Sequence, residues 1–159
     1  MNKKNMNLPV VKRPLQQVNP RRNKPKITIR GVSLPENDNF DEKFAWICSC
    51  LGFFETIDKG KTAAIIFKEL YLAGRQGIVL TSTSIAERIG MSRGSVINHL
   101  NNLKNAGLIE KSGKYYYTRH KTLEGIITEI EDDAIHIFSR MKRIGKEIDE
   151  KIDDVIKMK

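Results

Sequence analysis

The sequence predicts a mainly α fold with one small β-hairpin, an α+β arrangement, followed by a long C-terminal helix. Three observations predict it. Apolar residues recur at helical spacing in separate stretches between Phe40 and Leu103. Two short β-type runs lie on either side of Ser112-Gly113, and glycine tolerates the dihedral angles of a tight hairpin turn. From Thr122 to about Lys157, apolar positions alternate at spacings of four and three, the pattern of a helix with one long apolar seam.

Length and composition set the broad class of protein. At 159 residues with 40% hydrophobic residues, the chain has material for one core with appendages. No apolar run approaches the roughly 18 residues of a membrane span, and the basic N-terminus lacks the apolar region of a secretory signal. Two cysteines make no disulfide framework, so we expect a reducing, cytoplasmic setting and no membrane partner.

The net charge of +9 is unevenly distributed. Residues 1–30 hold nine basic residues and no acid, and residues 60–121 hold ten basic residues and three acids. The remaining segments, 31–59 and 122–159, are both net acidic. This segregation is typical of a chain that meets a polyanion with two of its parts, although a basic balance also serves solubility.

Residues 1–35 are predicted to be a disordered basic arm, because four of the five prolines lie in the first 30 residues and large apolar groups are few. Residues 26–32 alternate weakly and could form a short edge strand. Two interpretations of the arm stay open: it follows DNA phosphates or enters a minor groove, or it is an unspecific solvated leader. Its densest basic cluster is Arg21, Arg22, Lys24 and Lys26.

Residues 36–59 are predicted to contain one helix, from Asn39 to Phe54, with a capping box formed by Asn39 and Glu42. We expect its apolar face to pack on the C-terminal helix, in its own subunit or in a partner. Cys48 and Cys50 lie in this helix, where residues two apart point about 200° from each other. They therefore cannot chelate one ion together, and we predict structural cysteines and no metal site.

Residues 60–121 are predicted to form the main folded unit. A helix from Lys61 to Ala73 is followed by a short strand at 78–80 that pairs with the hairpin to give a three-stranded sheet. A short helix, about Thr83–Ile89, ends at Gly90, and Ser92 then caps a second helix that runs to Asn105. One face of the second helix is apolar, through Val96, Leu100 and Leu103.

The other face of the second helix carries small or hydrogen-bonding residues and no acid, as a surface inserted beside phosphates would. Arg and Asn also have the forked donors and acceptors that bind guanine and adenine edges in a major groove. His99 stays open between a DNA contact and a packing residue, and we expect Tyr115 and Tyr117 in the sheet core. The candidate contacts are Arg93, Gly94, Ser95, Asn98, His99 and Asn102, with Ser92 and Thr83 near phosphates at helix N-termini, and Lys111 and Lys114 on the hairpin.

The order helix, glycine turn, serine-capped helix and hairpin resembles a winged helix-turn-helix domain of the bacterial and archaeal ArsR/MarR type. The residues that carry the resemblance are SIAERIGMSRGSVINHLNNLKNAGLIEKSGKYYY, and it extends over residues 61–118. It implies the same DNA-contact assignments, with the hairpin as the wing. ArsR-type metal sensors carry cysteine or histidine ligand sets on DNA-contacting or dimer helices. The groove helix here has no cysteine, so metal sensing is not supported.

Residues 122–159 are predicted to form a long amphipathic dimerisation helix, because it outruns the core that the preceding unit offers. The alternative is a helix folded back on Asn39–Phe54 in the same chain. Lys151 interrupts the seam. The predicted dimer contacts are Ile130, Ile137, Met141, Ile144 and Ile148.

Together these patterns predict a homodimeric, sequence-specific regulator of transcription that binds double-stranded DNA and is cytoplasmic and nucleoid-associated. Such dimers read half-sites about 34–36 Å apart. We expect no cofactor or small-molecule ligand, and no enzyme, since the sequence shows no paired carboxylates, phosphate loop or Cys–His pair at useful spacing. Two rivals remain: a winged helix that docks proteins in a transcription assembly, and a sequence-neutral chromosome-associated protein.

Overall fold

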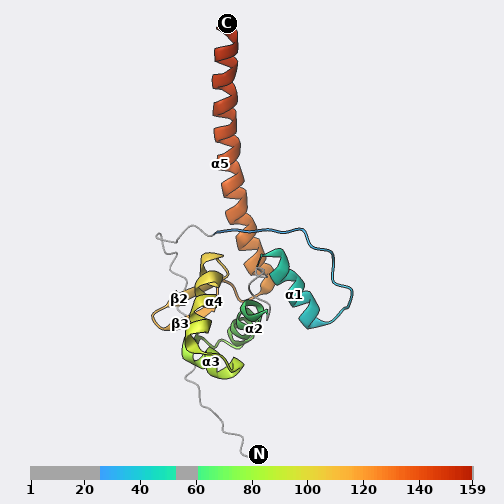
Figure 1. The fold of residues 1–159 in the computed structure, drawn as a ribbon, viewed down its shortest axis with the longest axis vertical. Coiled ribbons are helices and arrows are strands. Elements are labelled where there is room, and N and C mark those ends of the chain that lie inside the picture. The colour runs from blue at the N-terminus through green and yellow to red at the C-terminus, as the bar shows by residue number, and fades with distance from the viewer. Residues whose placement is uncertain (1–25, 53–60, 159) are drawn as a thin grey trace, which may run out of the picture.

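A computed structural model describes residues 26–52 and 61–158, and one long helix projects from the rest of the structure (Figure 1). The mainly helical α+β fold with a long C-terminal helix is confirmed. We call residues 61–122 the head. The elements in chain order are α1 (Phe40–Cys50), α2 (Thr62–Arg75), β1 (Leu80–Thr81), α3 (Ser82–Ile89), α4 (Arg93–Asn105), β2 (Ile109–Ser112), β3 (Tyr115–Thr118) and α5 (Leu123–Lys157).

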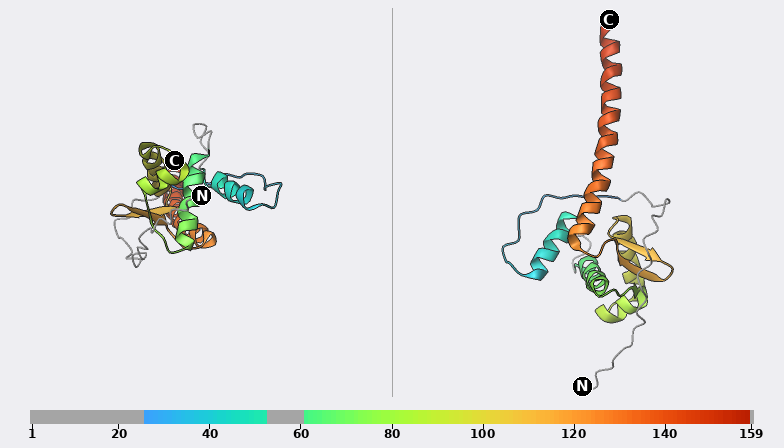
Figure 2. Two further views of the ribbon diagram at one scale, coloured as in Figure 1. Left: turned by 90° about the horizontal axis from the view of Figure 1, so that it is seen from below. Right: turned by 180° about the vertical axis from the view of Figure 1, so that it is seen from behind.

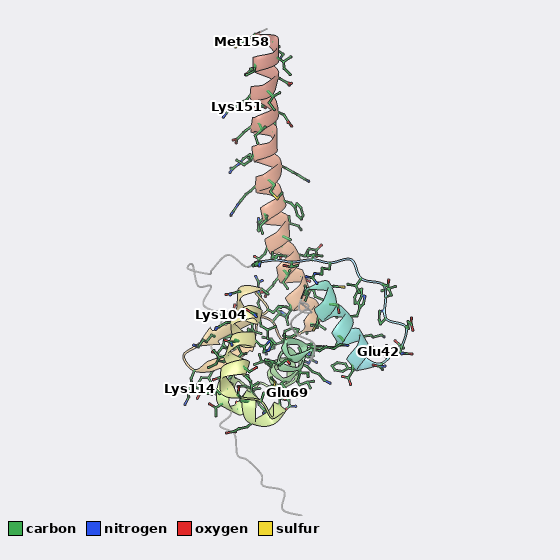
Figure 3. The ribbon with its side chains drawn as sticks, viewed as in Figure 1. Glu42, Glu69, Lys104, Lys114, Lys151 and Met158 are labelled. Atoms are coloured by element: carbon green, nitrogen blue, oxygen red, sulfur yellow. The ribbon has the colours of Figure 1, made fainter. Side chains whose placement is uncertain are left out.

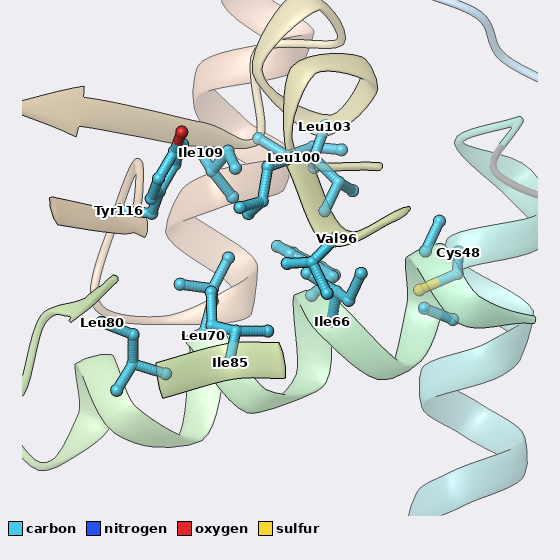
Figure 4. Close-up of a cluster of buried hydrophobic side chains, with 14 of the residues drawn as sticks. Cys48, Ile66, Leu70, Leu80, Ile85, Val96, Leu100, Leu103, Ile109 and Tyr116 are labelled. Atoms are coloured by element: carbon cyan, nitrogen blue, oxygen red, sulfur yellow. The ribbon is translucent and has the colours of Figure 1, made fainter. Parts of the chain in front are cut away.

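The core lies where α2, α3, α4 and the sheet meet, and the first turns of α5 close it (Figure 4). Each helix contributes one face. Ile66 and Leu70 of α2, Ile85 of α3, and Leu100 of α4 are all almost completely buried. Burial of such side chains is the main favourable term in folding, so these contacts fix how the helices are arranged.

The three strands form an antiparallel sheet in the order β1-β3-β2, which confirms the predicted three-stranded sheet. Ser112 pairs with Tyr115, so the turn is Gly113-Lys114 and not the predicted Ser112-Gly113; Gly113 has φ 56°. The prediction for the tyrosines was also wrong. Tyr116 pairs with buried Leu80 and is the buried one, whereas Tyr115 and Tyr117 point to the other face and are half-buried.

Helix α1 packs on α2, where we had expected the C-terminal helix as its partner. The ring of Phe44 lies 5.5 Å from that of Phe67 and 6.0 Å from that of Tyr71, between centroids. Asn39 caps the helix by accepting a hydrogen bond from the backbone N–H of Glu42. The helix ends at Cys50, where Leu51 is its C-cap and Gly52 has φ 75°, so it is shorter than the predicted Asn39–Phe54. Phe54 itself lies outside the described residues.

Residues 26–35 form no strand, in contrast to the edge strand considered from the sequence. Hydrogen bonds hold their backbone at separate points, and the carbonyl of Val32 accepts one of them from Nε1 of Trp46 at 3.3 Å. The N–H of Lys26 donates to the carbonyl of Asn105 at 2.8 Å, and the N–H of Arg30 donates to the carbonyl of Cys50 at 2.8 Å. This segment therefore runs from the end of α4 to the end of α1.

Residues 118–122, which we call the corner, join the sheet to α5. The guanidinium of Arg119 is 3% exposed and forms ion pairs with Glu129 and Asp133 of α5; its Nη1 lies 2.7 Å from the Asp133 carboxylate. The hydroxyl of Thr118 donates to the carbonyl of His120, and Thr122 caps α5 by accepting from the N–H of Gly125. The corner thus fixes the direction in which α5 leaves the head.

Beyond its first turns, α5 stands clear of the rest of the structure in both side views (Figures 1 and 2). Ile126 and Ile130 are buried in the core of their own chain, so Ile130 is not available for the dimer contact predicted for it. From Ile135 onward the large apolar side chains are exposed, and we call residues 135–157 the rod, about 35 Å long. Among the described residues, no helix combines the length and apolar character that crossing a bilayer requires.

Replacing Gly125 by Ala is expected to destabilise the protein, although alanine is the better helix former. A Cβ at this position would lie 2.0 Å from Nδ1 of His120, whose ring is held by hydrogen bonds to Thr122. We expect a loss of about 1–3 kcal/mol from this overpacking in thermal unfolding followed by circular dichroism. The matched control is Gly94→Ala in α4, where the added carbon meets nothing within 4 Å and stability should rise. Equal changes in stability for the two variants would contradict the close contact between Gly125 and the His120 ring.

Replacing Arg119 by Met should destabilise the protein by about 2–4 kcal/mol, because two carboxylates lose their buried partner. The estimate is below that for full burial, since Glu129 and Asp133 remain 31% and 27% exposed. Urea unfolding at fixed protein concentration measures it. The control is Arg88→Met, which breaks the more exposed pair with Glu69 and should cost less than about 1 kcal/mol. A loss at Arg119 no greater than at Arg88 would show that the corner is not a stabilising element.

Candidate nucleic-acid interface

Two capped helices separated by a glycine turn form the centre of the interface. Thr81 caps α3 in a reciprocal box, in which the N–H of Ser84 donates to the Thr81 hydroxyl oxygen and the N–H of Thr81 donates to the Ser84 hydroxyl oxygen. Gly90 ends α3 with φ 70°, and Ser92 caps α4 by accepting from the N–H of Ser95. These local signals set the helix–turn–helix angle, and Ile85 buried opposite Val96 holds it.

The outer face of α4 is exposed. Its buried face consists of Val96, Leu100 and Leu103, and the residues opposite are small or carry amides. At 100° per residue, Gly94, Asn98, Asn101 and Asn105 lie along the middle of the outer face, with Asn102 on one flank. The predicted groove residues Gly94, Asn98 and Asn102 are all exposed.

Asn101 is exposed in the middle of this face and was missed by the sequence analysis. The signal was present, because Asn101 lies three residues after Asn98 and seven after Gly94, and therefore on the same face. Asn105 follows one turn later and is also exposed.

The remaining predicted α4 residues flank this face. Arg93 is exposed, and its Nε donates to the hydroxyl of Ser82 in α3 at 3.3 Å, so the arginine is held across the two helices. Ser95 and His99 are half-buried. Thr83, in the first turn of α3, is exposed.

The hairpin presents two exposed lysines beside tyrosine rings. Nζ of Lys111 lies 5.5 Å from the ring centroid of Tyr116, and Nζ of Lys114 lies 5.5 Å from that of Tyr115. The faces of the two rings attract the ammonium groups electrostatically, and both lysines remain exposed to solvent. Figure 3 shows Lys114 on the hairpin and Lys104 at the C-terminal end of α4.

Of the four residues in the densest basic cluster of the predicted arm, only Lys26 belongs to the described residues. Its backbone bond to Asn105 places it at the C-terminal end of α4. Arg21, Arg22 and Lys24 lie outside the described residues.

The two cysteines have different surroundings. Cys48 is completely buried in the core, and burial raises the pKa of its thiol from 9.0 to about 12. Cys50 is half-buried. With so high a pKa, the Cys48 thiol stays protonated at neutral pH and does not supply the thiolate that attacks substrates or binds metals. Among residues 26–52 and 61–158, no three His, Cys, Asp or Glu side chains are grouped to hold a metal ion.

A known family matches part of the chain. The family described as bacterial regulatory protein, arsR family, matches residues 75–111, which run from the end of α2 through β1, α3 and α4 into β2. Neither the curated proteins nor the solved structures yield a match to the chain. The matched segment contains both capped helices, the glycine turn and the first hairpin strand. The chain therefore carries a winged helix-turn-helix of the ArsR type, the DNA-binding unit of a transcription regulator.

Proposed function

We propose that the protein is a homodimeric transcription regulator that recognises a specific double-stranded DNA sequence by placing α4 in the major groove. The observation that carries this proposal is the outer face of α4. It is exposed, contains no acid, and is held in place because the opposite face is buried in the core. A helix of this kind fits the width of the major groove without repelling the phosphates that line it.

Base recognition falls to the amides and the arginine. Asn98 and Asn101 lie one turn apart and can each form the two hydrogen bonds that identify an adenine, and Arg93 can do the same at a guanine or bind a phosphate. Gly94 has no side chain, so the backbone there can approach the DNA closely. The N-terminus of α4, capped by Ser92, favours a phosphate through its free N–H groups.

The wing lysines bind the backbone on the flank of the site. Lys111 and Lys114 are exposed on the hairpin next to the helix-turn-helix, where they can contact phosphates or the minor groove. Such contacts hold the protein on any duplex and contribute little to the choice of sequence. They make binding weaker as salt concentration rises.

The dimer is proposed to form through the rod. Its apolar side chains lie on one side of the helix and are about half exposed, for example Ile137 at 41% and Ile148 at 51%. A contiguous apolar stripe of this length in water marks an interaction surface. We propose that a second copy covers it, and that the dimer acts on the nucleoid in the cytoplasm without a small-molecule ligand.

Replacing both Arg93 and Asn98 by Ala should abolish sequence preference. Each bidentate base contact is worth about 1–3 kcal/mol of discrimination, so the affinity for the specific duplex should fall by at least tenfold. Gel shifts measure this with duplexes selected from genomic DNA and with random duplexes. Lys43→Ala, on an exposed part of α1, is the control and should leave DNA affinity unchanged.

Three outcomes of that experiment would reject the proposal. Unchanged specific affinity of the double variant would remove α4 from the groove. Equal affinity of the unaltered protein for random and selected duplexes would favour a sequence-neutral chromosomal protein. Failure to bind any duplex at low salt would favour a protein-docking module.

Replacing Lys114 by Ala should weaken binding to all duplexes by a similar factor. The loss of one phosphate contact should also reduce the slope of log affinity against log salt concentration by about one. A salt titration by fluorescence anisotropy measures the slope. Lys43→Ala, an exposed lysine of α1, serves as the comparison and should leave it unaltered. If the two variants have the same slope, the wing does not touch the backbone.

A further inference from the structure

Charged residues along α5 are sorted into blocks. Residues 124–133 hold five acids and no base, residues 140–146 hold four bases and no acid, and residues 147–154 hold five acids and one base. Every charged side chain from Arg140 to Asp154 is exposed. Among these residues, an ion pair joins Nζ of Lys146 to the carboxylate of Glu150 within one turn of the helix at 3.7 Å. Most of this charge pattern is therefore presented to solvent or to a partner.

The apolar stripe of the rod continues past Lys151. Ile148 and Ile152 are four residues apart, and Val155 follows after three more. The stripe therefore keeps close to the natural period of 3.6 residues and needs little supercoiling. Two such rods can pack side by side as nearly straight helices.

We infer that two copies of the chain pair through their rods in antiparallel orientation, with the two-fold axis near Lys146. The inference rests on the homodimer of the proposed function and adds its geometry. In this arrangement the basic block of each rod lies opposite the acidic block 147–154 of the other. In a parallel pair every block would face its own copy, basic against basic and acidic against acidic, which costs stability.

The apolar residues interdigitate in the same register. A centre at Lys146 brings Ile144 beside Ile148 of the partner subunit and Ile137 beside Val155 of the partner subunit. Met141 then meets Lys151 and Ile152 of the partner subunit. Lys146 lies at the centre, but it is two residues from both Ile144 and Ile148 and therefore points away from the stripe and from its own copy. Gly145 lies one residue from the centre on the side of the stripe, where its missing side chain lets the two helices approach closely.

The position of the two-fold axis, which we placed by pairing the charged blocks, also fits the length of α5 that is exposed. Residue 146 is the midpoint of the rod, residues 135–157. Below it, Ile126 and Ile130 are already buried in their own head, and Ile135 is 52% exposed. An antiparallel pair in this register therefore covers the whole exposed stripe of both chains, and each partner helix ends where the head begins.

The arrangement determines where the heads lie. Sixteen residues separate Ile130 from the centre in each chain, so the two Ile130 positions are about 50 Å apart, with the heads beyond them. Half-sites one turn of duplex apart, about 34–36 Å, are too close for both heads. The dimer should instead bind half-sites about two turns apart, or two separate duplex segments.

Disulfide trapping in the full-length protein tests the orientation. The background is Cys50→Ser with Cys48 retained, because Cys48 is buried and its thiol is hard to ionise. Ile137→Cys and Val155→Cys are made separately and oxidised with a copper–phenanthroline catalyst. We expect little cross-linking of either variant alone and efficient cross-linking after the two are mixed and allowed to exchange subunits. The background protein is the control and should not cross-link.

Two results would overturn the inference, and they differ from each other. Efficient cross-linking of each single variant with itself would show a parallel pair, leaving the homodimer of the proposed function intact. A monomer in sedimentation, without cross-links, would reject the dimer altogether. The gel shifts with the α4 variants test DNA recognition separately, because the substituted side chains lie on the head and not on the rod.

Discussion

The arrangement of the molecule depends on one buried cation. The Arg119 guanidinium leaves the end of β3, lies almost out of contact with water, and pairs with Glu129 and Asp133 on the second and third turns of α5. Removing a charge from water is costly unless partners compensate it, so these three side chains tolerate few alternative arrangements. The capping of α5 by Thr122 and the Thr118–His120 hydrogen bond act in the same direction. The sheet, the wing and the start of α5 consequently form one rigid unit.

Within the head, each helix separates a structural face from a free face. Helix α4 gives Val96, Leu100 and Leu103 to the core, which leaves its amide-rich side without structural duties. Helix α5 is divided along its length instead: its first turns are buried against the head, and the remaining turns are exposed. The surfaces that we propose for recognition and assembly are therefore held in place by the core, while the core does not depend on them. This separation explains why side chains on the outer face can be varied with little expected effect on stability.

Local signals predicted the elements that position the site. Gly90 specifies the turn and Ser92 the helix cap through local backbone and side-chain chemistry, independently of tertiary contacts. The apolar stripe of α4 marks its buried face, so the opposite face must be the exposed one. Features that depend on pairing at a distance were not predictable. Three consecutive tyrosines carry no alternation, so only the register against Leu80 selects Tyr116 for the interior. Likewise, the face of α1 is apolar enough for either α2 or α5, and nothing local links Arg119 to acids ten and fourteen residues later.

The stiffness of residues 118–122 has a mechanical consequence. A straight helix attached without a joint behaves as a lever, so a tilt at its base is magnified at its far end. Over a rod of about 35 Å, a tilt of about 5° displaces the tip by about 3 Å, close to one base-pair step of 3.4 Å. In the proposed dimer, substitutions that loosen residues 118–122 would therefore make the distance between the two bound sites less exact before they weakened contact with either site. The precision of that distance would depend on residues that touch no base.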